Sequence, residues 1–425
     1  MRAWIRRQPS HRISSTASIL GRRRTFSPVG SFRSPVAGAE HPEPPATPSA
    51  VFVAKYRPTR DARVGLCGYG LGTMNSPSSP AIGILANPMS GRDVRRLVAR
   101  AGHQTIEAKR SAIARIAVGA AAAGVRRIVI LREPLRVSTG ALESLAVPLD
   151  IEVLDVASRL DASDTTEAAR GMREAGCGAV VVLGGDGTNR IFAKAWPTAR
   201  IIPVSTGTNN VFPRLIEPTL AGAAAGLVAL GVVDPSLVAP RCKTVRVTLS
   251  DARNHPELSD LALVDAALLV DDQPGNLMPF EPGKLRTLVL TRAEPAAIGT
   301  SPIGGLLEPA GANDNFGVLV HCTGHDGGGK PLLVPISPGL YRPVHVAGAR
   351  RLALGEVVEI EGPGLLALDG DRMHVLAEGE IARLEVRRDG PQVIDVELAL
   401  TLAARSGHFL GRTLEDRSGG LPGCC

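Results

Sequence analysis

The chain has 425 residues, of which 44% are hydrophobic, 21% charged and only 3% aromatic, a composition typical of a globular protein with two domains and a tail. The net charge is +7, but residues 1–80 hold twelve Arg and Lys against three acids, which leaves a balance of −2 for the remainder. Because the remainder has no excess of cations to neutralise a phosphate backbone, we exclude a nucleic-acid partner. No apolar run is long enough to span a bilayer, so no stable membrane association is expected.

Residues 1–80 are rich in Arg, Ser, Pro and Gly and show no sustained hydrophobic period, which predicts a disordered basic tail. Two interpretations stay open. The segment resembles a transit peptide, which is rich in Arg and Ser and poor in acids. Alternatively it is upstream sequence translated in error, and the true start is Met74. We favour the second because Met74 stands just before the first predicted strand.

From residue 81 to 238, short apolar runs alternate with helical patterns. We predict strands at 81–86, 127–131, 150–156, 179–183 and 201–204, and helices at 110–123, 164–175 and 189–196. Asp164 is expected to cap the second of these helices, with Glu167 completing a capping box. Strands that alternate with helices predict an α/β domain, built on a parallel sheet with helices on both faces.

Residues 239–405 instead contain short, often alternating runs separated by Gly and Pro, which predict a β-rich second domain. The boundary is placed at 235–240. Residues 406–425 are expected to form a flexible C-terminal tail. The six cysteines form no CxxC pair and their use fits a reducing cytosol, so we expect a cytoplasmic location.

The strongest motif is Gly184-Gly-Asp-Gly-Thr188, which follows a predicted strand and precedes a helix. Glycines let the backbone approach a polyphosphate and adopt positive φ, so that N–H groups point at the phosphates. The helix N-terminus adds partial positive charge. Asp186 can hold a metal ion or take a proton from an attacking hydroxyl. The pattern therefore predicts a nucleotide site with Asp186 as its catalytic residue.

Two further loops of small polar residues, 205–210 and 87–91, follow predicted strands of the same sheet. Loops at the carboxyl ends of parallel strands form a crevice suited to a nucleotide. The residues expected to contact the nucleotide are Asn87, Ser90, Gly91, Gly184, Gly185, Gly187, Thr188, Asn189, Ser205, Thr206, Gly207, Thr208, Asn209 and Asn210.

In the second domain, Asp369-Gly370-Asp371 follows an apolar run. The two carboxylates are the predicted ligands of Mg²⁺. By spacing alone a hairpin turn is the favoured interpretation, because Asp-Gly is a strong hairpin dipeptide.

In this order, the motifs resemble those of the superfamily that joins NAD kinases to diacylglycerol and sphingosine kinases, and they are most similar to its acetoin catabolism protein X branch. The resemblance spans about residues 81–400 and implies a nucleotide-binding α/β domain followed by a β-sandwich-like domain. It also implies ATP, Mg²⁺ and NAD as acceptor, with Asp186 at the adenosine ribose 2′-hydroxyl. We also expect a homo-oligomer.

The chain departs from the NAD kinase pattern at the start of the second domain. Where NAD kinases carry an Asn-Glu pair that grips the dinucleotide, this chain has Val264-Asp265, so that Asp265 is the expected contact. Two alternatives stay open: a kinase acting on a lipid or sphingoid base, and a non-catalytic nucleotide-binding accessory protein of acetoin catabolism. The near-neutral folded part and the low aromatic content speak against the lipid acceptor.

Overall fold

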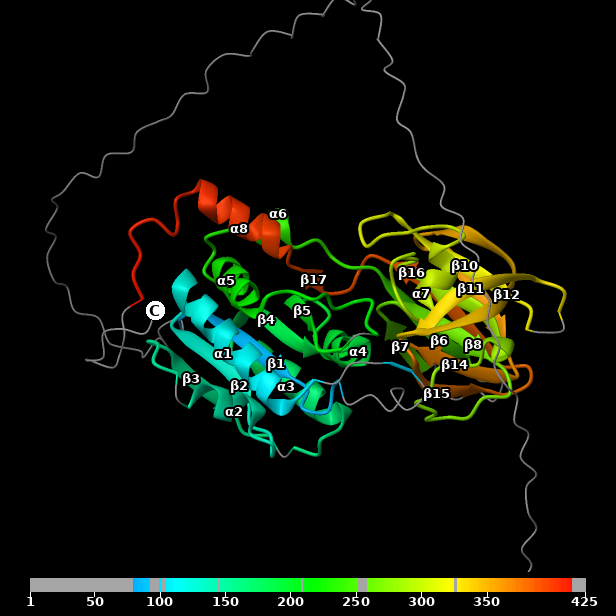
Figure 1. The fold of residues 1–425 in the computed structure, drawn as a ribbon, viewed down its shortest axis with the longest axis horizontal. Helices are drawn as coiled ribbons and strands as arrows, with labels where there is room; N and C mark the ends of the chain where they lie inside the picture. The colour runs from blue at the N-terminus through cyan, green and yellow to red at the C-terminus, as the bar shows by residue number, and fades with distance from the viewer. Residues whose placement is uncertain are drawn as a thin grey trace, which may run out of the picture. The chain divides into compact units, whose positions relative to one another are not determined.

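A computed structural model describes residues 79–91, 99–100, 104–143, 145–156, 158–207, 209–250, 258–324 and 327–414 (Figure 1). All of them belong to one compact unit, Thr73–Cys425. The predicted basic tail, except for its last two residues, and the last eleven residues of the predicted C-terminal tail lie outside the described ranges. Within the described ranges, no helix has the length and apolar character that a bilayer span would need.

A parallel sheet forms the centre of the first part of the fold. Its strands are β1 (Ala81–Ala86), β2 (Arg127–Leu131), β3 (Asp150–Leu154), β4 (Cys177–Gly184), β5 (Arg200–Ser205) and β17 (Gln392–Val393). They lie in the order β17-β5-β4-β1-β2-β3 and every pairing is parallel. The inner strand β1 is buried along its whole length, as expected for a sheet covered on both faces.

Helices cover both faces of this sheet. One face packs against α1 (Ile106–Ala123), α2 (Val137–Leu142), α5 (Pro218–Ala229) and α8 (Val396–Arg405). The other face packs against α3 (Ala162–Glu174) and α4 (Asp186–Ala195). A short helix, α6 (Pro235–Val238), follows α5. Helices α1 and α5 approach closely because both carry glycine at the contact: a Cβ on Gly222 would lie 1.9 Å from the carbonyl oxygen of Ile116.

Two helix starts differ from the sequence prediction. Helix α1 begins at Ile106, where Thr105 accepts a hydrogen bond from the N–H of Ala108. Helix α3 is capped by Asp161 rather than Asp164. Asp164 is buried and turns back to the preceding loop, where its carboxylate accepts the N–H groups of Arg159 and Leu160. The N–H groups of that loop bind the Asp164 carboxylate, which is therefore not available to cap the helix.

The second part is a sandwich of two antiparallel sheets. The larger has the order β11-β12-β10-β9-β8-β14-β15 and the smaller β13-β16-β6-β7. The larger contains β8 (Asp265–Leu269), β9 (Leu285–Leu290), β10 (Phe316–Cys322), β11 (Lys330–Ser337), β12 (Leu340–Ala353), β14 (Gly364–Leu368) and β15 (Asp371–Leu376). The smaller contains β6 (Thr244–Ser250), β7 (Leu258–Ala262), β13 (Val357–Glu361) and β16 (Ile381–Arg387). A core that joins side chains such as Val247 and Leu384 to Val289 and Leu366 lies between them. The predicted fold class is confirmed.

The chain returns to the first sheet after the sandwich. Strand β17 pairs with β5, and α8 packs against α5, beside which it lies in Figure 1. The sequence prediction assigned all of 239–405 to the second domain, whereas β17 and α8 complete the first. The outgoing and returning segments are bonded to each other: the N–H of Cys242 donates to the carbonyl of Pro391, and that of Val393 to Pro240. Two connections therefore join the parts.

Candidate functional site

The three predicted nucleotide loops meet at one edge of the parallel sheet. They follow β1, β4 and β5, which are neighbours in the sheet. Asn87 donates from Nδ2 to the hydroxyl of Thr188 at 2.9 Å, and the Thr206 hydroxyl donates to that of Ser90 at 2.9 Å. Asn210 donates to the hydroxyl of Ser205 at 2.8 Å. Side chains far apart in the sequence thus tie the loops together.

The Gly184–Thr188 segment is a tighter turn than the sequence analysis assumed. Strand β4 ends at Gly184, and α4 begins at Asp186, so Gly187 and Thr188 lie in its first turn. None of the three glycines has positive φ. The first two are needed for close approach instead: a Cβ would lie 2.6 Å from Thr188 Cβ at Gly184, and 2.9 Å from the Asn210 side chain at Gly185. At Gly187 a Cβ would meet nothing within 4 Å.

A buried lysine supports the loop after β1. Lys109, only 1% exposed on α1, donates from Nζ to the carbonyl oxygens of Asn87, Pro88 and Ser90 at 3.0, 2.8 and 2.6 Å. Hydrogen bonds from a charged donor are stronger than neutral ones. The ammonium group therefore fixes the path of this loop. Gly91 at its end has φ +72°, and a Cβ there would lie 2.5 Å from the carbonyl oxygen of Thr206.

Asp186 begins helix α4 and faces a cavity. Its carboxylate accepts the N–H of Phe212 at 2.8 Å and that of Val211 at 3.1 Å. Removal of water by the packed surroundings, followed by the charge of Asp369, raises the pKa of Asp186 to about 7. The two N–H bonds oppose this shift but do not cancel it. A carboxyl that titrates near neutral pH can both accept and return a proton.

The cavity at Asp186 has a volume of about 260 Å³ and contains two further carboxyls, those of Asp265 and Asp369. Burial, and then their mutual repulsion, raise the pKa of Asp265, while burial raises that of Asp369. Asp369 accepts three backbone N–H groups, from residues 263 to 265, whereas Asp265 accepts the Thr300 hydroxyl at 2.7 Å. The three N–H groups favour the anion at Asp369, so a proton shared by the pair resides on Asp265.

Asp369 and Asp371 do not form the predicted pair of Mg²⁺ ligands. Asp369 and Gly370 both have positive φ, 50° and 81°, and make the two-residue turn between β14 and β15. This turn sends Asp369 into the cavity and Asp371 away from it, to an ion pair with Arg190. Among the described residues, no three His, Cys, Asp or Glu side chains are grouped so as to hold a metal ion.

Arg190 on α4 connects the two parts of the fold. Besides Asp371 it contacts Asp260 of β7 at 3.4 Å. Asp260 also accepts Lys194 and His374, each at 3.0 Å. Burial opposes ionisation of Asp260, but its hydrogen bonds and the nearby cations prevail and lower its pKa. The helix that begins with Asp186 is thus held against the sandwich by a buried ionic network.

The other predicted nucleotide contacts have different surroundings. The carbonyl oxygen of Gly207 accepts the Ser205 hydroxyl at 2.8 Å. Asn209 lines the Asp186 cavity, and Ser205 and Thr206 line a neighbouring cavity of about 490 Å³. Asn189 is buried and donates to the carbonyl oxygen of Gly185 at 2.9 Å, so its contact with a nucleotide stays a prediction. Thr208 lies outside the described residues.

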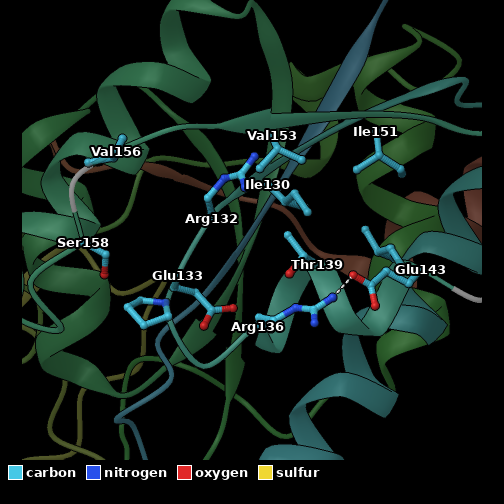
Figure 2. Close-up of a pocket in the computed structure, with 12 residues that line it drawn as sticks. Ile130, Arg132, Glu133, Arg136, Thr139, Glu143, Ile151, Val153, Val156 and Ser158 are labelled. Carbon is cyan, nitrogen blue, oxygen red and sulfur yellow. Dashed lines mark hydrogen bonds and ion pairs between the residues drawn. The ribbon is translucent and has the colours of Figure 1, made fainter.

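A further cavity, of about 690 Å³, lies at the carboxyl ends of β2 and β3 (Figure 2). Arg136 and Glu143, drawn there as an ion pair, stand on one side of it. Glu133 is buried and accepts the N–H of Ser138 at 2.8 Å, and burial raises its pKa. None of the predicted site residues lines this cavity.

Sequence analysis did not identify Lys109 or Thr300 as part of the site. A signal for Lys109 was present: it falls on the apolar stripe of α1, with Ala112, Ile113 and Ile116, where a lysine must find buried acceptors. Thr300 gave no such signal, because its role depends on the fold that brings it to Asp265.

Comparisons with known proteins agree with this arrangement. A family model described as the ATP-NAD kinase N-terminal domain matches residues 82–231, and one described as the acetoin catabolism protein X C-terminal domain matches residues 243–389. Acetoin catabolism protein X of Cupriavidus necator is 34% identical over 346 residues, which cover 79% of this chain and 95% of that protein. These matches support a kinase-like, nucleotide-binding protein.

Two solved structures are also similar. Yeast NADH kinase, complexed with NADH, aligns with a TM-score of 0.47 at 10% identity, over 80% of this chain and 90% of that one. A proposed diacylglycerol kinase from Bacillus anthracis str. Sterne aligns with a TM-score of 0.41 at 13% identity, over 75% and 98%.

Proposed function

The chain belongs to the acetoin catabolism protein X family, and we propose that it is an ATP-dependent phosphotransferase that transfers the terminal phosphoryl group of MgATP to the ribose 2′-hydroxyl of NAD. The observation that carries the proposal is the position of Asp186, a carboxyl with a pKa near 7 that faces a cavity at the start of a helix. A general base is most effective when its pKa lies near the working pH.

In the proposed reaction, ionised Asp186 accepts the proton of the 2′-hydroxyl. The oxygen then bonds to the γ-phosphorus while the bond from that phosphorus to the β–γ bridging oxygen breaks, and ADP leaves. Asp265 and Asp369 line the same cavity and would orient the ribose through its hydroxyl groups. Mg²⁺ would enter with ATP, held chiefly by its phosphates.

The donor phosphates would lie against the three bonded loops, with the N-terminus of α4 directed toward them. Lys109 would keep the first loop in place. Phosphoryl transfer gains most of its rate from alignment and neutralisation of charge, which such loops supply.

One observation favours a second candidate, a nucleotide-binding accessory protein without turnover. The residue before Asp265 is the buried, apolar Val264, so the amide that would grip a dinucleotide is missing. Such a protein would bind ATP or NAD and release no NADP.

The test is incubation with ATP, Mg²⁺ and NAD, with NADP followed by an NADP-specific dehydrogenase. Asp186→Asn should lose activity, whereas the control Asp150→Asn, at the exposed amino end of β3, should retain it. Equal NADP formation by wild type and Asp186→Asn would remove Asp186 from the mechanism. ATP binding without NADP formation would remove NAD as the acceptor and leave another hydroxyl substrate or the accessory role.

A further inference from the structure

A separate cavity lies where the two connections join the α/β part to the sandwich. Its volume is about 810 Å³ and both connections line it, through Arg241 and Cys242 on the outgoing segment and Arg388 and Val393 on the returning one. None of the residues predicted to bind the nucleotide lines it. A ligand in this cavity would therefore contact both parts of the fold without entering the site at Asp186.

The lining of this cavity is basic. Four arginines, at positions 214, 241, 292 and 388, line it together with Asn313 and Asn315, against the two acids Asp395 and Glu397. Arg214 is already paired with Glu294, which leaves three arginines against the two acids. The Asp395 carboxylate already accepts the N–H of Leu398 as the cap of α8. The excess of fixed positive charge favours an anion.

Arg292 is the most informative of these arginines because it is only 6% exposed. Its guanidinium lies over the ring of Phe212, 4.7 Å from the centroid, and donates one long hydrogen bond of 3.4 Å to the carbonyl of that residue. In the part of the chain that the structure describes, no acid lies within ion-pair distance of it. A buried charge that has one long hydrogen bond and no ion pair costs free energy, and a bound anion would offset that cost.

Arg388 is oriented by the loop before β10. It donates to the carbonyl oxygens of Ala312, Asn313 and Asp314 and to the side chain of Asn315. It also donates to the carbonyl oxygen of Arg241, so both terminal nitrogens of its guanidinium are occupied. Lys243 holds the same loop through the carbonyl oxygens of residues 311 and 316. Two cations thus fix the loop that presents the two asparagine amides to the cavity, which makes the site preorganised.

We propose that this cavity is a second ligand site, which binds a small organic molecule through a phosphate group held by Arg292, with Arg388 adding positive charge beside it. Guanidinium groups match phosphate oxygens in pairs. Apolar side chains on the opposite wall, among them Ile216, Leu237 and Val238, would cover the organic body of the ligand. The volume is in the range typical of small-molecule sites.

The test uses inorganic pyrophosphate as the probe, with calorimetric titration of the whole chain at low ionic strength and without nucleotide. Arg292→Met should weaken binding about 10- to 100-fold, the usual effect of losing a charged hydrogen-bond donor. Arg388→Met should weaken it as well, and thermal unfolding of both variants verifies that they are folded. Arg383→Met is the matched control, because Arg383 is an exposed arginine of β16 that pairs with Glu359. This variant should bind pyrophosphate as wild type does.

The variant Gly187→Ala distinguishes binding in this cavity from binding at the nucleotide loops, because the substitution alters only the turn after β4. The proposal requires that Gly187→Ala keep the wild-type affinity. It is overturned if wild type does not bind pyrophosphate, or if both arginine variants bind it as tightly as wild type. It is also overturned if Gly187→Ala alone abolishes binding, since the anion then occupies the nucleotide loops.

Discussion

The N–H of Phe212 donates to Asp186 at 2.8 Å, and this bond holds the carboxyl of Asp186 toward the cavity that Asp265 and Asp369 share with it. The bond would favour the ionised form if it acted alone. Burial of Asp186 and the negative charge of Asp369 outweigh this bond, and the pKa of Asp186 is raised to about 7.

The first prediction concerns the pH dependence of catalysis. If Asp186 is the general base, it must be ionised, so kcat/KM should fall about tenfold per pH unit below about pH 7 and level off above it. Asp186→Asn should lower kcat by about 10²- to 10⁴-fold and abolish this dependence. The measurement is NADP formation from pH 5 to 9. A wild-type profile that is flat between pH 5 and 8 would exclude Asp186 as the base.

The second prediction concerns stability. The pKa of Asp186 is raised from 3.8 to about 7 on folding, so the folded state binds a proton that the unfolded state has lost. The stability contribution is present below pH 4 and is lost as the pH rises to about 7. Asparagine does not titrate, so the Asp186→Asn variant does not lose this stability as the pH rises. Its stability relative to wild type should increase between pH 4 and 7, by roughly 3 kcal/mol, and stay constant above.

Denaturant unfolding of wild type and Asp186→Asn at pH 4.5, 6 and 8 measures this difference. Asp150→Asn, which removes an exposed carboxyl far from the cavity in the sequence, serves as the control. A difference between Asp186→Asn and wild type that does not change with pH would show that Asp186 titrates normally.

The fold class and the meeting of the three loops could be predicted because their signals are local. Each strand is a short apolar run, small polar residues follow it, and the alternation with helices requires parallel strands whose carboxyl ends share an edge. The return of β17 and α8 could not be predicted, because two residues of strand and one short helix carry no mark of the sheet they join.

The positions of Asp369 and Asp371 could not be predicted from the sequence. Their spacing indicated both a hairpin and a pair of ligands, and the two interpretations exclude each other once the turn forms. With positive φ at Asp369 and Gly370, neighbouring carboxyls point to different surroundings, one to a cavity and one to Arg190. The partners of both carboxyls come from segments more than 100 residues away in the chain.

The third prediction contrasts two glycines of one motif. At Gly184 a Cβ would lie 2.6 Å from Thr188 Cβ, so Gly184→Ala should destabilise the fold by about 1–3 kcal/mol. At Gly187 there is open space in the first turn of α4, so Gly187→Ala should stabilise it by about 0.5–1 kcal/mol. Gly187→Ala should nevertheless raise the KM for ATP, because the methyl group enters the space proposed for the phosphates. Unfolding and steady-state kinetics on both variants test this; an unchanged KM in Gly187→Ala would place the phosphates elsewhere.

The fourth prediction concerns Lys109. Lys109→Met removes a donor to three buried carbonyl oxygens and should destabilise the fold by about 2–4 kcal/mol. If the loop positions ATP, the KM for ATP should rise about tenfold while that for NAD changes little. Lys330→Met, at the exposed start of β11, is the matched control. Equal increases in both KM values would indicate a general loss of structure rather than a role in positioning this loop.

The fifth prediction concerns the ionic network that holds α4 to the sandwich. Asp260 is 7% exposed at its side chain and contacts Arg190, Lys194 and His374. Asp260→Asn removes the charged acceptor of this group, while Arg190 keeps its pair with Asp371, so the substitution should cost about 1–3 kcal/mol. Glu359→Gln, which breaks an exposed pair with Arg383, should cost at most about 1 kcal/mol. Denaturant unfolding at pH 7 compares them. The pKa of Asp260 is lowered in the folded state, so the stability advantage of wild type over Asp260→Asn should be complete above pH 4 and decline as the pH falls below 4. Similar costs for Asp260→Asn and Glu359→Gln would mean that water screens the network and that α4 is held by its apolar contacts.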